Sequence, residues 1–490
     1  MFRLNRDVLY LIFQEIKDDK KTLYSCLSVN KTWCEMIIPI LWNNPWKYIN
    51  KNCEHRKKKL LLNIIISHLS NEIKNNLKDQ GIDFLTTNSY QKPLLFNYIN
   101  LCKHLNLEEI HKLINSIHEQ SKTFIIKNQL FELFINENTK FTHLYLPYQF
   151  EHQIHLIPKS ETCFSDIEFF CCSASINDNV IIGLKEICKL IKELKLFIEV
   201  HNNNYGIIEL INNQNNLLSI SFLINYTEYS RTYGYTRAHE SFCKKLEDSL
   251  INHANTIQYF KTTKEPITNI ISKFVNLKEL ELDCSYYYEW NCLENLSLPF
   301  LRILKASRVP IKILTSLIEN TSGKLNEIKI DYIFHDEINN ERIIQTIYNN
   351  CPNLKYLKLV LRNINILEFE KLLINCQYLE GLFILINNIE DEFNLEKLFE
   401  ILTNSSPIGL FKFKFSIYSD TIFKLETLKL FFDNWEGRHP MLLQFNKIGY
   451  IEEYTNLIEI YKSKKIVKNF DNLFYGHIYE DFEWVCKRVN

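Results

Sequence analysis

The histidines and cysteines of this 490-residue chain are the side chains that could hold a metal ion or act as nucleophiles. His104, His111 and His118 recur every seven residues, a spacing that would place them on one face of a helix. Zinc sites on helices use closer spacing and need a fourth ligand, so a solvated helix flank is the preferred interpretation. His152 and His155 have no cysteine or carboxylate at a matched spacing, and we expect them in a loop.

The 14 cysteines are scattered and include no Cys-x-x-Cys pair. In a reducing compartment, cysteines of this kind are most often small buried apolar residues. The adjacent Cys171 and Cys172 suit strand packing better than a shared metal ion. The sequence therefore predicts no metal site, no cofactor and no set of catalytic residues, and we expect that the chain is not an enzyme.

Glycine is scarce, with 10 residues in the whole chain, against an average usage of about 7%. The patterns GxGxxG, GxxxxGK[ST] and GxSxG are all absent. These motifs depend on glycine for close approach to phosphate or for a sharp turn at a nucleophile. Their absence excludes the nucleotide-binding proteins and serine hydrolases that depend on these motifs. An active site built from scattered residues would leave no such signal in the sequence.

The overall charge gives no indication of nucleic acid or membrane as a partner, because the net charge is −1 and the pI is near 6.9. The basic cluster "HRKKK" at 55–59 is either a nuclear-import or phosphate-binding patch or the solvated start of a helix. Asp7 and Glu15 interrupt the first apolar stretch, and no apolar run approaches the roughly 20 residues of a membrane span. We expect a cytoplasmic or nuclear protein.

Two stretches rich in tyrosine could bind a partner, "YTEYSRTYGYTR" at 226–237 and "YYYEW" at 286–290. Tyrosine and arginine are enriched at the energetic centres of interfaces, and loops on rigid scaffolds often carry recognition. Tyr233, Tyr235 and Tyr287 are therefore candidate substrate contacts. The alternative is that these rings fold back onto the core.

The elements that would position these residues form a repeat, in which apolar residues occupy the first, fourth and sixth positions, as in "LKELEL" at 277–282. Most copies are 20 to 29 residues apart, the period of leucine-rich repeats, and the intervening segments have helical periodicity. "NNCPNLKYLKL" at 349–359 resembles the helix-to-strand junction of such repeats. The pattern predicts an α/β solenoid, a horseshoe with about 11 strand–helix repeats; the alternative is an ordinary α/β domain. The first apolar residue of each copy falls at 141, 164, 191, 217, 257, 277, 301, 325, 354, 379 and 410.

Strand side chains alternate, so the variable positions beside the middle apolar residue should share one face. That face has mixed charge, which fits a protein partner better than a nucleic acid. The candidate substrate-binding residues among them are Glu279, Glu281, Tyr356, Lys358, Lys412 and Lys414, and the same face should carry Glu193, Lys195, Glu327 and Lys329.

The sequence of the first 42 residues lacks the strand–helix repeat and predicts three short helices. Val8, Leu9, Ile12, Phe13 and Ile16 form one apolar face at helical period, and Asn5 is a candidate N-cap. A short second helix follows over 22–30, and Pro39 should kink or restart the third. Such a small unit needs a neighbour or a partner to stabilise it. It could simply cap the larger domain.

This N-terminal stretch, "LNRDVLYLIFQEI…LYSCLSVNKTWCEMIIPILW", resembles the F-box. It departs from that motif at Asn5, where proline is usual. The resemblance implies binding to the Skp-type adaptor of a cullin–RING ubiquitin ligase. The residues that would face the adaptor or shape its binding face are Leu4, Leu9, Ile12, Phe13, Leu27, Val29 and Trp33; alternatively, several of them only form the core of the unit.

The expected organisation is an F-box at 1–46, a helical linker at 47–138, a leucine-rich-repeat solenoid at 139–435 and a C-terminal repeat or cap at 436–490. The resemblance implies a substrate receptor of an SCF-type ligase, whose repeats bind a protein substrate. The alternative is a repeat scaffold or recognition protein outside the ubiquitin system.

Overall fold

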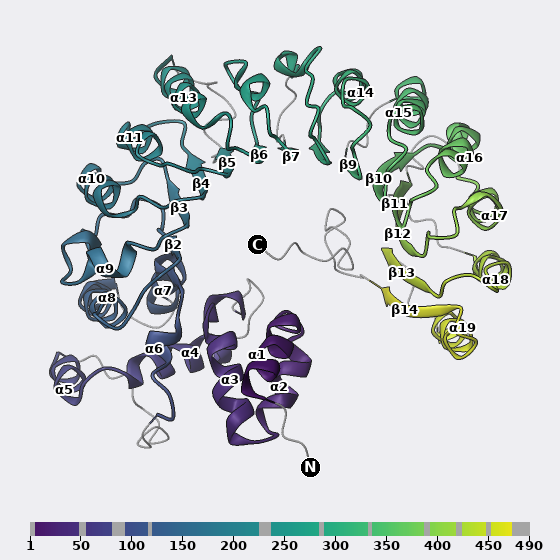
Figure 1. Cartoon of the computed structure of the whole chain (residues 1–490). Helices are drawn as coiled ribbons and strands as arrows, with labels where there is room; N and C mark the ends of the chain where they lie inside the picture. The colour runs from purple at the N-terminus through teal and green to yellow at the C-terminus, as the bar shows by residue number, and fades with distance from the viewer. Residues whose placement is uncertain are drawn as a thin grey trace. The chain divides into compact units, whose positions relative to one another are not determined.

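The computed structural model is an α/β protein, and the described residues contain fourteen strands that are parallel neighbours in the order of the chain (Figure 1). The α/β class predicted from the sequence is confirmed. The chain divides into two compact units, Met1–Leu218 with Ile224–Ser249, and Ser219–Leu223 with Leu250–Asn490. The structure describes residues 5–48, 55–80, 94–115, 120–224, 237–283, 289–331, 336–386, 393–417, 424–446 and 452–472.

The first unit begins with three helices, α1 (Arg6–Glu15), α2 (Lys20–Leu27) and α3 (Lys31–Trp42). Asn5 caps α1 as predicted, because its side-chain oxygen accepts a hydrogen bond from the Asp7 amide at 3.3 Å. Pro39 lies inside α3 without ending it, so of the two predicted outcomes, a kink or a restart, the restart does not occur. Six buried residues form the shared core of the three helices: Leu9, Phe13, Leu23, Met36, Ile37 and Leu41.

The region predicted as a helical linker contains the first strand of the sheet, β1 (His104–Asn106). Cys102, Leu105 and Leu107 are all buried and follow the spacing of the repeat, with cysteine in its first position. His104 therefore lies on a strand, and its predicted place on a solvated helix flank is wrong. The helices of this region are α4 (His55–Ser67), α5 (Asn71–Asp79), α6 (Tyr98–Leu101), α7 (Leu107–Asn115) and α8 (Gln120–Phe134).

The rest of the first unit alternates strands and helices. The predicted copy of the repeat at 164 is shifted by three residues. Its first apolar position is the buried Ile167, and β3 begins two residues after it. The remaining elements are β2 (His143–Tyr145), β3 (Phe169–Ser173), β4 (Glu193–Ile198), α9 (Ser160–Phe164), α10 (Asp178–Ile187), α11 (Gly206–Asn212) and α13 (Arg237–Ser249), with 3-10 turns η1 (Pro45–Tyr48) and η3 (Ile154–Leu156).

The second unit carries most of the repeat, and Figure 1 shows helices α14 to α19 on one side of its strands. Its strands are β5 (Ser219–Ile224, whose last residue belongs to the first unit), β6 (Tyr259–Thr262), β7 (Glu279–Asp283), β8 (Ile303–Ser307), β9 (Glu327–Ile330), β10 (Tyr356–Leu361), β11 (Gly381–Ile386), β12 (Lys412–Ile417), β13 (Met441–Asn446) and β14 (Val467–Asn472). Its helices are α14 (Ile311–Glu319), α15 (Glu337–Asn350), α16 (Ile366–Asn375), α17 (Leu395–Ser405), α18 (Leu425–Asp433) and α19 (Glu452–Ser463), with 3-10 turns η4 (Leu250–His253), η5 (Ile270–Lys273), η6 (Asn291–Leu293) and η7 (Asn363–Asn365).

The apolar positions of the repeat form the core between strands and helices. In the copy at 277–282, Leu277, Leu280 and Leu282 are all buried, and β7 begins two residues after Leu277. The same offset holds at every other predicted copy except the one at 164. The ladder also continues through β13 and β14, inside the region expected to form a terminal repeat or cap.

Candidate functional site

The side of the second unit's strands that faces away from the helices carries charged residues in aligned rows. Strand pairing brings Glu281 of β7, Lys305 of β8, Lys329 of β9 and Lys358 of β10 into one row. The same row continues through Phe383 and Lys414 of β11 and β12, and we call it the middle row. The preceding row contains Glu279, Ile303, Glu327, Tyr356, Gly381 and Lys412, so the predicted residues of β7, β9, β10 and β12 share this face. The predicted Glu193 and Lys195 lie on β4, in the first unit.

In the middle row, Glu281 is followed by lysines on three consecutive strands, and the preceding row places the carboxylates of Glu279 and Glu327 beside them. Lys305 Nζ lies 3.0 Å from a Glu279 carboxylate oxygen, and Lys261 pairs with Glu281. Lys329 Nζ lies 2.8 Å from Glu327 within its own strand. Cross-strand pairs of this kind stabilise the sheet. They also fix the lysine head groups in place before any partner arrives.

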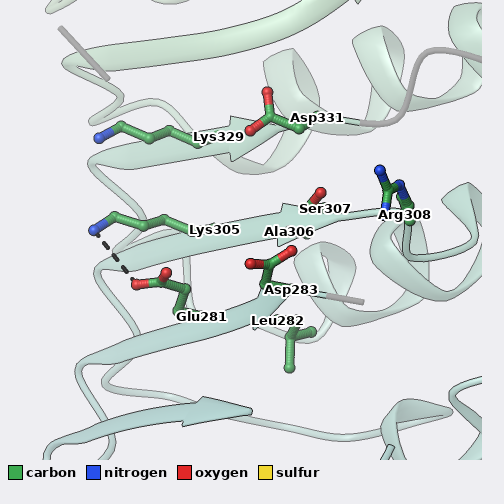
Figure 2. Close-up of a pocket in the computed structure, with 9 residues that line it drawn as sticks. All are labelled: Glu281, Leu282, Asp283, Lys305, Ala306, Ser307, Arg308, Lys329 and Asp331. Carbon is green, nitrogen blue, oxygen red and sulfur yellow. Dashed lines mark ion pairs between the residues drawn. The ribbon is translucent and has the colours of Figure 1, made fainter. Parts of the chain in front are cut away.

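A pocket of about 340 Å³ opens at the carboxyl ends of β7, β8 and β9 (Figure 2). Figure 2 shows Lys305 directed toward Glu281 and Arg308 at the far end of the lining. Three carboxylates and three cations give the pocket balanced charge, so a polar segment with groups of both signs fits it. The lining residues are Glu281, Leu282, Asp283, Lys305, Ala306, Ser307, Arg308, Lys329 and Asp331.

Most of this pocket was missed from the sequence. Asp283, Ser307 and Asp331 each stand one position beyond the sixth residue of the repeat, where the chain leaves the strand. Carboxyl ends of neighbouring parallel strands meet at one edge of the sheet. That shared position was the signal that could have found them.

Tyr356 and Lys412, two of the predicted substrate contacts, hold each other in place across β11. The Tyr356 hydroxyl donates to Glu380 at 2.9 Å and accepts from Lys412 Nζ at 3.0 Å. The tyrosine ring passes over Gly381, where an added Cβ would lie 2.8 Å from Tyr356 Cδ1. The absence of a side chain at Gly381 thus permits the close approach of the Tyr356 ring. Tyr356 and Lys412, at the amino ends of β10 and β12, are both partly exposed.

Lys358 and Lys414, two further predicted contacts, are almost completely buried, at 1% exposure each. Lys358 Nζ lies 2.5 Å from Asp331 Oδ1, which compensates its charge. Both ammonium groups lie near the same ring, 4.6 and 4.7 Å from the centre of Phe383. Neither lysine is available to a partner in this structure.

The predicted adaptor-binding residues divide between the core and the surface of the three-helix unit. Leu9 and Phe13 are buried, and Leu27 and Trp33 pack against their cluster. Ile12 and Val29 are exposed. Leu4 lies outside the described residues, as do the candidate substrate contacts Tyr233, Tyr235 and Tyr287.

The apolar face predicted for the first helix divides into a buried and an exposed part, and Leu11, which was not identified from the sequence, belongs to the exposed part. Val8, Leu11 and Ile12 follow the i, i+3, i+4 spacing of a helix face and are 43%, 64% and 43% exposed. This exposed stripe lies beside the buried Leu9 and Phe13. Exposed apolar groups in such an arrangement mark contact surfaces.

Comparison with known proteins gives no family. No protein-family model matches the chain, and no curated protein is significantly similar to it. Among the described helices, none is long and apolar enough to cross a membrane. Within the same residues, no cluster of histidine, cysteine or carboxylate side chains could hold a metal ion.

Strand β1 joins the N-terminal helices to the sheet within the first unit. The carbonyl of Asn43, just after α3, accepts hydrogen bonds from the amides of Lys103 and His104 at 2.9 and 3.3 Å. Trp46 Nε1 donates to the His104 carbonyl at 2.6 Å. The His104 ring stacks on His143 of β2, with centroids 3.7 Å apart. Backbone and side-chain bonds together fix the three-helix unit on the first strand.

The stacked histidines should make the first unit sensitive to acid. Burial lowers the pKa of His104 to about 3 and that of His143 to about 4. The unfolded chain, with a histidine pKa near 6.5, binds more protons than the folded chain between these values, so stability falls as pH falls below about 6.5. From pH 6.5 to pH 5 we expect each histidine to reduce the free energy of unfolding by about 2 kcal/mol.

Urea denaturation at pH 7 and pH 5 would measure this dependence. His143→Phe keeps a stacked ring but removes one titrating group, so its loss of stability between the two pH values should be smaller than that of the wild type by about 2 kcal/mol. Burial also lowers the pKa of His68, His111, His152 and His155, and their contributions remain in the variant. A variant with the full wild-type pH dependence would contradict the assignment to this pair.

Proposed function

We propose that this chain is the substrate receptor of a cullin–RING ubiquitin ligase. Its three-helix unit, resembling an F-box, would bind a Skp-type adaptor, and its strand face, formed by units resembling leucine-rich repeats, would bind a protein substrate. The observation that carries the proposal is the exposed Val8, Leu11 and Ile12 stripe on α1. A small unit with a six-residue core that still exposes three apolar side chains on one helix face is suited to docking.

The mechanism is proximity without chemistry by this chain. An adaptor held at α1 and a substrate held at the strand face would be kept together, so the effective concentration of substrate at the ligase would rise. The bonds from Asn43 and Trp46 to β1 support this function, because they limit motion between the adaptor-binding helices and the first strand.

The charged rows support a protein as the substrate. The lysines of β8 and β9 are each paired with a carboxylate, Lys305 with Glu279 and Lys329 with Glu327, so their positive charge is compensated. A nucleic-acid track needs a continuous run of uncompensated positive charge. Partly exposed Glu281 and Lys305, with the exposed Asp283, offer both signs to a complementary surface at the pocket of Figure 2.

Adaptor binding by the full chain tests the proposal. Leu11→Glu with Ile12→Glu places two charges on the stripe, and we expect the affinity for a purified Skp-type adaptor to fall by at least about 100-fold, since a desolvated charge at an interface centre costs several kcal/mol. Both positions are exposed in the free chain, so helix content by circular dichroism should not change.

The matched control is Leu367→Glu with Ile374→Glu, which alters two exposed apolar residues of α16. This control should bind the adaptor like the wild type. A wild-type chain that binds no Skp-type adaptor would overturn the proposal and favour a scaffold outside the ubiquitin system. Equal binding by the stripe variant would show that α1 is not the contact.

A further inference from the structure

Most charged side chains that line the pocket of Figure 2 are held in ion pairs, so their charges are compensated inside the protein. Opposite charges in contact cancel most of each other's field at a distance. The balanced lining therefore offers a ligand much less charge than its number of ionic residues suggests. The pairs are Lys305 with Glu279, Lys329 with Glu327, Asp331 with Lys358 and Glu281 with Lys261.

Asp283 is the exception among the carboxylates of the lining. It is the last residue of β7, it is exposed, and its side chain has no ion pair or hydrogen bond among the residues that the structure describes. Arg308 stands at the far end of the lining in Figure 2, and no ion pair joins it to Asp283. The β7 end of the pocket is therefore left negative, and it should attract a cation.

Ser307 of β8 forms the hollow beside this carboxylate. Strand pairing sets Ser307 next to Asp283, one strand spacing of about 4.8 Å away. On the other side, the Asp331 amide donates to the Ala306 carbonyl at 2.9 Å, which brings Asp331 beside Ser307 as Figure 2 shows. The serine side chain is shorter than the two aspartates, and its hydroxyl can accept a hydrogen bond. A cation above Ser307 would have the hydroxyl and the Asp283 carboxylate as acceptors.

The size of the pocket suits one long side chain. Its volume of about 340 Å³ is near the lower end of the range for ligand pockets, about 300–1,000 Å³. Lysine and arginine carry a cation with several N–H donors at the end of an apolar stem, and Leu282 and Ala306 supply apolar lining for that stem. A calcium ion fits less well, because it takes about 6–8 oxygen ligands, and Asp283 is the one carboxylate of the described lining that is outside an ion pair.

We propose that this pocket binds a lysine or arginine side chain of the substrate, whose cation donates hydrogen bonds to the Asp283 carboxylate and the Ser307 hydroxyl. The inference rests on the proposed function, because it names the group by which a protein substrate would be recognised at the strand face. The substrate segment that binds there should therefore contain a basic residue. The mixed charge of the surrounding rows would then contact the residues that flank it.

Methyl NMR spectra of the full chain, labelled with ¹³C at alanine, would detect this binding, because alanine is rare in the chain and Ala306 lines the pocket. The probes are the Nα-acetyl, N-methylamide derivatives of lysine and arginine, and the same derivative of norleucine keeps the stem without the cation. We expect a saturable shift of the Ala306 signal with lysine, arginine or both, at an affinity at least about tenfold higher than that of norleucine. The signal of Ala174, which lies in the first unit, should not move.

Asp283→Asn removes the unpaired charge and keeps the shape of the side chain, and it should weaken binding of the basic probes at least about tenfold. The matched control is Asp248→Asn, which alters an exposed carboxylate of α13 outside the pocket and should bind like the wild type. The proposal is overturned if neither basic probe shifts Ala306, if norleucine binds as tightly, or if Asp283→Asn binds like the wild type. No adaptor is present in this experiment, so a failure here is distinguishable from a failure of adaptor binding by the three-helix unit.

Discussion

Asp331→Ala is expected to reduce the free energy of unfolding of the second unit by about 3–5 kcal/mol, because it strands a buried ammonium group. Lys358 Nζ lies 2.5 Å from Asp331 Oδ1, and the lysine side chain is 1% exposed. The carboxylate is 18% exposed and keeps some water, so the lower end of that range is the better estimate. Urea denaturation followed by circular dichroism would measure the loss.

A second substitution tests whether the unpaired Lys358 ammonium group causes the loss of stability in Asp331→Ala. Lys358→Met replaces the charged stem with an apolar chain of similar shape, so the double variant Asp331→Ala with Lys358→Met should recover most of the lost stability. Lys358→Met alone should cost less than Asp331→Ala, since the partly exposed Asp331 can regain water. A loss below about 1 kcal/mol in Asp331→Ala, or no recovery in the double variant, would show that the pair is not what holds this face.

The repeat was predictable because its apolar positions are core positions. A strand beginning two residues after Leu277, Leu325 or Leu354 follows from burial of the first, fourth and sixth residues. The prediction failed at 164 because Phe164 also starts the same spacing, yet it belongs to the end of α9 and is itself buried. It missed β1 because cysteine takes the first position there, in a strand of three residues.

The face of a side chain was predictable, but its exposure was not. Alternation places Lys358, Lys412 and Lys414 on the side away from the helices, and it carries no information on what lies against that side. Lys412 is partly exposed while Lys414, two residues later, is buried. Reversing the charge of Lys414 would therefore disturb the fold as well as any substrate contact, whereas Lys412 can be tested by itself.

For α1 too, the sequence did not predict which apolar side chains are exposed. Helical period groups Val8 with Leu9 and Phe13 in one apolar face, and Leu11 widens that face around the helix. The residues alone do not say which part of it packs against α2 and α3. Only the packed unit shows that Phe13 meets the Trp33 ring edge-on, with centroids 5.1 Å apart, while Leu11 stays exposed.

Phe13→Ala is accordingly expected to unfold the three N-terminal helices locally. Phe13 is 1% exposed, and removing a buried phenylalanine costs about 3–5 kcal/mol. A core of six buried residues has little reserve against such a loss. Hydrogen exchange should show amide protection lost over α1, α2 and α3, with protection retained over β5 to β14. Adaptor binding, if present in the wild type, should disappear along with that protection.

Leu11→Ala is the matched control on the same helix, because it removes an apolar side chain that is 64% exposed. It should change stability by no more than about 0.5 kcal/mol and leave amide protection intact. Under the proposed function it should still weaken adaptor binding, so the two variants separate residues that hold the unit together from residues that contact a partner. Amide protection that survives in Phe13→Ala would place this side chain outside the core, and a loss of protection in Leu11→Ala would show that the exposed stripe also supports the fold.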